Sequence, residues 1–127
     1  MLENLRSGAI HFNSGRFFEA HEDWEVRWRE LPPSDRAQVQ AAILVCGVFV
    51  LLKKARIEPA GRLARLAIER FAEAVTASKV ELVSPVLRLP DAEDRMLRVL
   101  ARIRLGERDS VLLLSEAKGL KAVIDGA

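Results

Sequence analysis

The chain has 127 residues, 50% of them apolar, and its 20 Lys and Arg against 18 Asp and Glu leave a net charge of +2. This length supports about one hydrophobic core, and so small a net charge creates no general attraction to nucleic acid. Cys46 is the single cysteine, which excludes an internal disulfide and fits a reducing compartment. Residues 1–15 contain no apolar run of secretory type. We therefore expect one domain over residues 1–127, located in the cytoplasm.

The first two predicted helices form a hairpin. Residues 3–13 have helical spacing of apolar side chains, and Gly15 follows where a left-handed C-terminal cap is wanted. A second helix over about residues 16–31 is stopped by Pro32 and Pro33. The side chains of the first helix expected to point inward are Leu5, Ala9, Ile10 and Phe12.

A third helix, over about residues 35–55, is the centre of the predicted fold. Ser34 or Asp35 can cap its first turn, because either side chain can accept a hydrogen bond from an exposed amide. Residues 41–52 contain no charged or strongly polar side chain, so the helix is apolar around its whole circumference. This run is far shorter than the roughly twenty residues needed to cross a bilayer, so we expect a core helix and no membrane span. Cys46 is expected to be a small buried apolar side chain within it.

Two further helices and a tail complete the pattern. Pro59 suits the first turn of a fourth helix that reaches about residue 77, and Asp91 can cap a fifth that ends at Gly106. Residues 78–90 are expected to be an irregular connection, because a strand over residues 80–83 would have no partner. Residues 106–127 are expected to add one helix. The inward stripes of the fourth and fifth helices are Leu63, Leu66, Ala67, Phe71 and Ala74, and Met96, Leu97, Leu100 and Ile103.

The predicted fold is all-α, a compact bundle of about five to six helices built from two helical hairpins around the central apolar helix. A weak repeat supports the hairpins, because residues 15–20 align with residues 55–60 at an offset of forty. Each copy lies between two helices and ends on an alanine, Ala20 or Ala60, at a close crossing. Two copies are too few for a solenoid, which favours a compact bundle.

The most informative stretch is residues 17–28, because it places a histidine and a carboxylate in the aromatic face of a helix. A buried carboxylate is costly without a partner, so Glu25 must meet a charge, a donor, a metal or water. His21 lies one turn before Glu25, within reach of it. We predict a buried polar clasp in which His21 and Glu25 bind each other or Gln40. The residues that share this sector at 100° per residue are Phe17, His21, Trp24, Glu25 and Trp28.

Residues 12–22, followed by Glu25 and the pair Trp28-Arg29, resemble the signature of the uncharacterised bacterial and archaeal domain-of-unknown-function family number 309. The similarity covers about residues 4–75, with the next helix, to about residue 105, a looser match. It implies a compact all-helical protein with no established activity. The positions that match its recurring polar and aromatic set are Glu19, His21, Glu22, Glu25, Trp28 and Gln40. Members commonly carry a glutamine, a histidine and a Gly-Asn turn where this chain has Leu44, Leu51 and Ala55-Arg56, which implies a reduced polar site here.

Two chemistries stay open for His21 and Glu25. The pair could ligate a divalent metal, and with Glu22 it has the outline of a zinc-protease helix, but the second histidine of that motif is absent. We therefore predict no cofactor and keep the metal as an alternative. Hydrolase-like acid-base chemistry would use the same two residues, with Glu22 as a further candidate. The candidate pocket residues are Glu19, Trp24, Trp28 and Gln40.

A basic patch is formed by Arg95, Arg98 and Arg102, which repeat at helical spacing on the fifth predicted helix. We expect them to pair with acidic residues, since nucleic-acid binding would need exposed aromatic rings that this chain spends on its core. So high an apolar content in a short chain also suggests self-association. The expected function is a small non-enzymatic helical module that forms a homo-oligomer, most simply a dimer. The alternative is a metal-dependent or small-molecule-dependent enzyme using His21 and Glu25.

Overall fold

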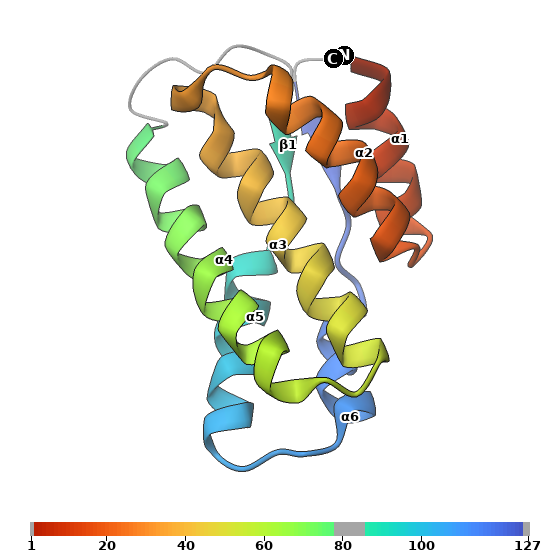
Figure 1. Ribbon diagram of the computed structural model, residues 1–127, viewed down its shortest axis with the longest axis vertical. Helices are drawn as coiled ribbons and strands as arrows, with labels where there is room; N and C mark the ends of the chain where they lie inside the picture. The colour runs from red at the N-terminus through yellow and green to blue at the C-terminus, as the bar shows by residue number, and fades with distance from the viewer. Residues whose placement is uncertain (1, 78–85, 126–127) are drawn as a thin grey trace.

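The computed structural model describes residues 2–77 and 86–125, and it confirms the all-α prediction (Figure 1). A central helix, α3, is flanked by the α1–α2 pair and by α4 and α5, and the C-terminal segment runs behind it. The elements in chain order are α1 (Leu2–Asn13), α2 (Phe17–Glu30), a 3-10 turn (Pro33–Asp35), α3 (Arg36–Lys53), α4 (Ile57–Ala77), β1 (Val86–Arg88), α5 (Ala92–Arg104), α6 (Ser110–Leu114), a second 3-10 turn (Ser115–Ala117) and β2 (Val123–Asp125).

Helix α3 forms the core of the molecule, as its unbroken apolar run predicts. It packs against α2, α4 and α6, and Val45, Val48 and Phe49 are fully buried. Cys46 is also fully buried, and this burial raises the pKa of its thiol far above the ordinary range. With 18 residues and a mean hydropathy of 1.5, α3 has the length and composition of a membrane-crossing helix, a test that buried core helices also pass.

The two hairpin turns share one backbone geometry, in agreement with the forty-residue repeat. Gly15 and Ala55 both adopt the left-handed conformation, with φ of 79° and 58°. In both turns the next residue closes a Schellman-type cap. These hydrogen bonds run from the N–H of Arg16 to the carbonyl of His11 (2.8 Å) and from the N–H of Arg56 to the carbonyl of Leu51 (2.9 Å). Ala20 and Ala60, the small residues of the repeat, are fully buried.

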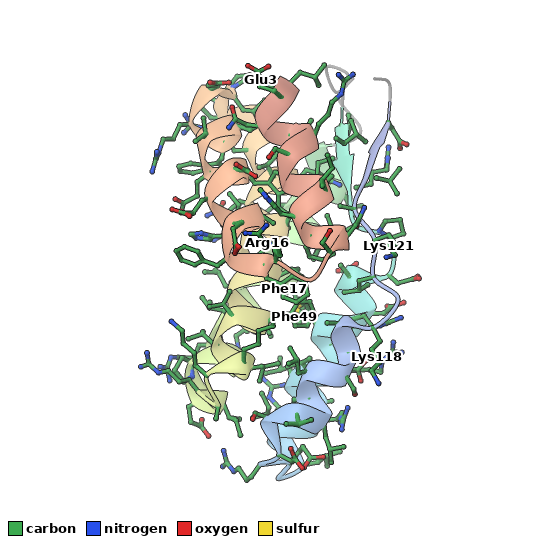
Figure 2. The ribbon with its side chains drawn as sticks, turned by 90° about the vertical axis from the view of Figure 1, so that its right-hand side faces the viewer. Glu3, Arg16, Phe17, Phe49, Lys118 and Lys121 are labelled. Carbon is green, nitrogen blue, oxygen red and sulfur yellow. The ribbon has the colours of Figure 1, made fainter. Side chains whose placement is uncertain are left out.

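Helices α1 and α2 are joined by an indole that lies over a glycine. Trp24 is fully buried, and its Nε1 donates a hydrogen bond to the carbonyl of Leu5 at 3.1 Å. A Cβ on Gly8 would lie 2.2 Å from this Nε1, so the indole occupies the space that any larger residue would fill. Phe17, at the start of α2, extends the contact to α3, with its ring centroid 5.0 Å from that of Phe49 (Figure 2).

The C-terminal half corrects two predictions. Residues 86–88, expected to be irregular, form β1, which pairs antiparallel with β2 so that Leu87 faces Ile124. Residues 80–83 lie outside the described residues. Among the described residues of the tail, helical geometry covers only Ser110–Leu114 and the following 3-10 turn, because Lys118 is extended with a ψ of 130° and Gly119 then takes a φ of 81°. The tail therefore supplies a strand partner that the sequence analysis did not foresee.

Some predicted details of the helices are wrong. Ile10 and Leu97 are exposed, because the buried stripe of each helix passes one residue earlier, at Ala9 and at Met96. Neither predicted aspartate makes a capping hydrogen bond. Asp35 lies in the preceding 3-10 turn, and Asp91 is left-handed with a φ of 68°. The side chain of Ser34 is outside the described part of the structure.

Replacing Gly8 with alanine should destabilise the fold although alanine favours helix. We expect a loss of about 2 kcal/mol in the free energy of unfolding, because the new methyl group would displace Trp24. Urea unfolding measures this loss. Gly61→Ala is the matched control, since its Cβ would lie 3.4 Å from the flexible end of Ile103, and it should be neutral or stabilising. Equal effects of the two substitutions would contradict the role given to Gly8.

Candidate functional site

A cavity of about 320 Å³ lies between α2, α3 and α4, and four predicted site residues line it together. Its lining consists of His21, Glu25, Trp28, Gln40, Ile43, Leu44, Gly47 and Leu63. We call it the α2–α3–α4 cavity. Because α2 and α3 form an antiparallel hairpin, residues late in α2 lie beside residues early in α3. Trp28 and Gln40 therefore mark one end of the cavity, while His21 and Gly47 mark the other.

His21 and Glu25 form a pair, but the pair is not buried as predicted. Nε2 of His21 lies 3.2 Å from Oε1 of Glu25, and the two side chains are 30% and 38% exposed. Nη2 of Arg29 lies 3.6 Å from the second carboxylate oxygen of Glu25. The fully buried side of α2 is formed by Ala20 and Trp24 instead, so the His21 side of the helix meets the cavity and solvent. The pair is half-buried, and both side chains are open to solvent.

The two tryptophans have different roles. Trp24 was a candidate pocket residue, but it is core, because Gly8 admits its indole between α1 and α2. Trp28 lines the α2–α3–α4 cavity, and the Arg36 guanidinium lies 4.9 Å from the centroid of its ring.

Two nitrogen atoms on residues that line the cavity are buried and have no hydrogen-bond partner. Nε1 of Trp28 and Nδ1 of His21 have no hydrogen bond to any residue in the described part of the chain. A buried polar atom left unpaired costs about 1–3 kcal/mol. Such atoms are uncommon in folded proteins, and each calls for a structural or functional reason. Both atoms belong to residues that line the α2–α3–α4 cavity, although the atoms themselves are enclosed by protein.

Glu19 and Glu22, which the sequence analysis grouped with His21, lie outside the cavity. Glu19 accepts a hydrogen bond from Nε of Arg16 at 2.9 Å at the start of α2. A hydrogen bond from its own backbone N–H, together with Arg16, holds the pKa of this carboxyl below its usual value. Glu22 is exposed. Both residues point away from the cavity because they are offset around the helix from His21.

Sequence reasoning missed a second histidine pair. Nδ1 of His11 lies 2.7 Å from Oδ2 of Asp23 and joins α1 to α2. Asp23 is not among the residues that share the aromatic sector of the second helix. Only the packing of α1 against α2 brings the two residues together, so no local pattern could have shown the pair.

The donor set for a metal is small. Among the residues that the structure describes, no group of three or more His, Cys, Asp and Glu side chains is arranged to hold an ion. His21 and Glu25 alone would supply two ligands to a metal that commonly takes four, as zinc does.

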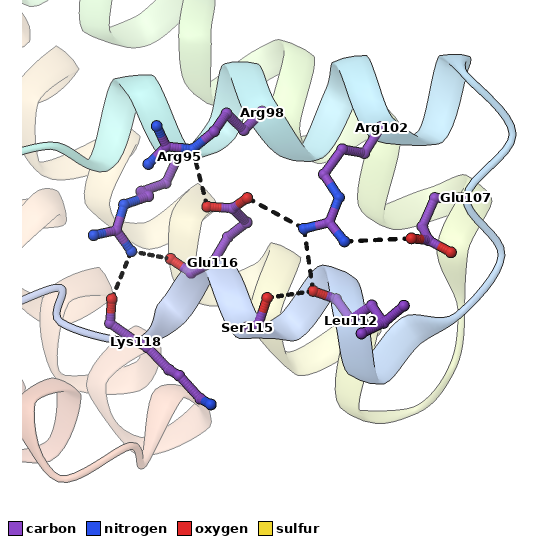
Figure 3. Close-up of polar contacts among 8 residues, drawn as sticks. All are labelled: Arg95, Arg98, Arg102, Glu107, Leu112, Ser115, Glu116 and Lys118. Atoms are coloured by element: carbon purple, nitrogen blue, oxygen red, sulfur yellow. Dashed lines mark hydrogen bonds and ion pairs between the residues drawn. The ribbon is translucent and has the colours of Figure 1, made fainter.

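The basic residues of α5 bind the C-terminal segment (Figure 3). Nη1 of Arg95 donates to the carbonyls of Glu116 (2.7 Å) and Lys118 (2.6 Å). Arg98 and Arg102 pair with the carboxylate of Glu116 at 3.1 and 3.2 Å. The Glu116 side chain is largely buried by these contacts. Three arginines that looked like a basic patch are thus paired within the chain.

Comparison with known families gives a match to the N-terminal part of the chain. Residues 5–63 match a family model described as Domain of unknown function (DUF309), which confirms the predicted resemblance over this segment. No curated protein and no solved structure matches the chain. The matched segment extends from α1 into α4 and contains every lining residue of the α2–α3–α4 cavity. Helix α5, helix α6 and the two strands follow it.

Replacing each of the two tryptophans with phenylalanine should affect stability differently. Trp28→Phe removes an unpaired N–H, and this gain offsets the loss of ring contact area and of the Arg36 contact, so the free energy of unfolding should stay within about 0.5 kcal/mol of the parent value. Trp24→Phe removes the hydrogen bond to Leu5 and leaves a void, which should cost about 2 kcal/mol. Urea unfolding of both variants makes the comparison. A large loss in Trp28→Phe would show that its N–H already has a partner.

Proposed function

We propose that this chain, whose residues 5–63 belong to a family of unknown function, is a small helical binding module that takes a small molecule into the α2–α3–α4 cavity. The observation that carries the proposal is the cavity itself, in which the polar side chains of His21, Glu25 and Gln40 meet apolar walls. Its volume of about 320 Å³ is at the lower end of the range usual for small-molecule sites. Apolar walls with a few polar groups are also typical of such sites.

Binding is favoured over catalysis by the chemistry of the lining. The eight lining residues include no serine, threonine, cysteine or lysine that could act as a nucleophile. Glu25, the candidate base, has His21 at one oxygen and Arg29 at the other. The alternative is an enzyme in which His21 and Glu25 exchange a proton with a bound substrate or hold a metal, and it would use the same cavity.

The cavity can be tested without knowing its ligand. A Cβ on Gly47 would lie 2.9 Å from Cδ1 of Leu63, so Gly47→Ala should push Leu63 into the cavity with little loss of stability. In a screen of small polar organic fragments by NMR of labelled protein, we expect shift changes at His21, Trp28 and Gln40. We expect Gly47→Ala to weaken binding at least tenfold, with Gly61→Ala unchanged. Shift changes located elsewhere, or binding that Gly47→Ala leaves intact, would refute the proposal.

We also propose that the module forms a dimer through the end of the molecule where α5 meets α6. Leu105 and Val111 are 87% and 74% exposed, and Leu112 lies beside them in the chain and is also exposed. Exposed apolar side chains concentrated in one short segment are characteristic of interaction surfaces. A module of this kind would function in the cytoplasm, with no contribution from nucleic acid.

Light scattering at high protein concentration tests the dimer. The parent chain should have twice the monomer mass, and the double substitution Leu105→Glu with Val111→Glu should give a monomer, because charge at a buried interface is costly. Ile10→Glu, on an equally exposed apolar residue of α1, should leave the dimer intact. A monomeric parent chain would count against self-association.

A further inference from the structure

The lining of the α2–α3–α4 cavity has a negative formal charge. Among the described residues that line it, only Glu25 is formally charged, since His21 is taken as neutral at pH 7 and Gln40 is an amide. Helix α2, which carries Glu25, has five acidic against two basic residues, a net charge of −3. The other lining residues are uncharged and apolar or aromatic: Trp28, Ile43, Leu44, Gly47 and Leu63. The charge of the lining therefore favours a cationic ligand over an anionic one.

The neighbours of Glu25 in the chain leave its carboxylate open to a ligand. Nη2 of Arg29 lies 3.6 Å from Oε2 of Glu25, beyond hydrogen-bond distance, and the Arg29 side chain is 68% exposed. An exposed ion pair of this kind contributes little to stability, so a ligand can displace Arg29 at low cost. Nε2 of His21 lies 3.2 Å from Oε1, but a neutral imidazole leaves the charge of the carboxylate uncompensated.

An ammonium group matches the polar part of this cavity. It carries a positive charge and three N–H donors, and its hydrogen bonds to a carboxylate are stronger than those between neutral groups. Gln40 offers a further acceptor, because its side chain makes no hydrogen bond to another described residue. A carboxylate ligand would instead meet the like charge of Glu25.

The apolar part of the cavity matches an aliphatic body. Ile43 and Leu44 of α3 and Leu63 of α4 line it, and all three side chains are only partly buried. A hydrocarbon group that covers them removes apolar surface from water, which favours binding without any directional contact.

We propose that the ligand of this cavity is a small organic cation, a primary amine with an aliphatic body. Its ammonium group pairs with the Glu25 carboxylate in place of Arg29, and its body lies against Ile43, Leu44 and Leu63. This assignment rests on the proposed binding function and adds the class of ligand.

Hexylamine, hexanol and hexanoate have the same chain and differ in charge, so they separate the ligand classes. Titration calorimetry at neutral pH and about 0.15 M salt should give the tightest binding for hexylamine and the weakest for hexanoate. Glu25→Gln should weaken hexylamine binding about tenfold, the effect of losing a hydrogen bond to a charged group, and leave hexanol binding within about twofold. Glu22→Gln removes the same charge from an exposed residue of α2 outside the cavity, and this matched control should change neither.

Arg29→Ala should have the opposite effect to Glu25→Gln. Removing the guanidinium frees Oε2 of Glu25, so hexylamine binding should strengthen about threefold while hexanol binding stays the same. Because Arg29 is exposed, circular dichroism should show the fold unchanged. A role of Glu25 in stability alone would give no such gain, and an unchanged affinity for hexylamine would overturn the displacement of Arg29.

The other outcomes distinguish the ligand class from the binding function. Hexanol or hexanoate binding in the cavity as tightly as hexylamine would overturn the organic cation while supporting a small-molecule site. Hexylamine binding that Glu25→Gln leaves intact would overturn it too. If none of the three probes binds but polar fragments produce NMR shift changes at His21 and Gln40, the ligand class fails and the binding function stands. If neither the probes nor the fragments bind there, both fail.

Discussion

The fold depends on covering a helix that is apolar on every side. Between residues 41 and 52, helix α3 has no polar face to turn toward water, so α2, α4 and α6 each pack against part of its circumference. The cover is incomplete where Ile43, Leu44 and Gly47 stay half-buried. Those three residues form one wall of the α2–α3–α4 cavity. The cavity is thus the part of the α3 surface that α2 and α4 approach without closing.

Most of the fold could be predicted from local sequence signals. The contacts between segments far apart in the chain could not. Gly15, the proline pair Pro32-Pro33 and Gly106 end helices through their own backbone preferences, so the helix boundaries can be read from the chain. The pairing of residues 86–88 with 123–125 has no such local signal. A three-residue strand is defined by its partner, and that partner lies in a tail whose leucines and alanines suggested helix.

The sequence predicted which residues of α2 lie together at the site. It did not predict how deeply they are buried. Helical spacing brought His21, Glu25 and Trp28 onto one side of α2, and the structure places all three around one cavity. The same projection grouped Trp24 with them, since neighbouring residues of a sector differ by a rotation too small for a sequence to resolve. What separates Trp24 from Trp28 is Gly8 on another helix, which admits one indole to the core. Burial of the His21–Glu25 pair failed for the same reason, because depth is set by neighbouring helices.

The tie between Asn13 and Ala122 has a consequence for the order of folding. The Asn13 side chain exchanges two hydrogen bonds with the backbone of Ala122, at 3.1 and 2.7 Å, across a separation of 109 residues. The helical hairpins close over short loops and gain their contacts early, whereas this contact must offset the entropy of closing nearly the whole chain. We therefore expect it to form after the bundle has brought its ends together. A contact made this late leaves the rate of folding almost unchanged and acts as a latch that slows unfolding.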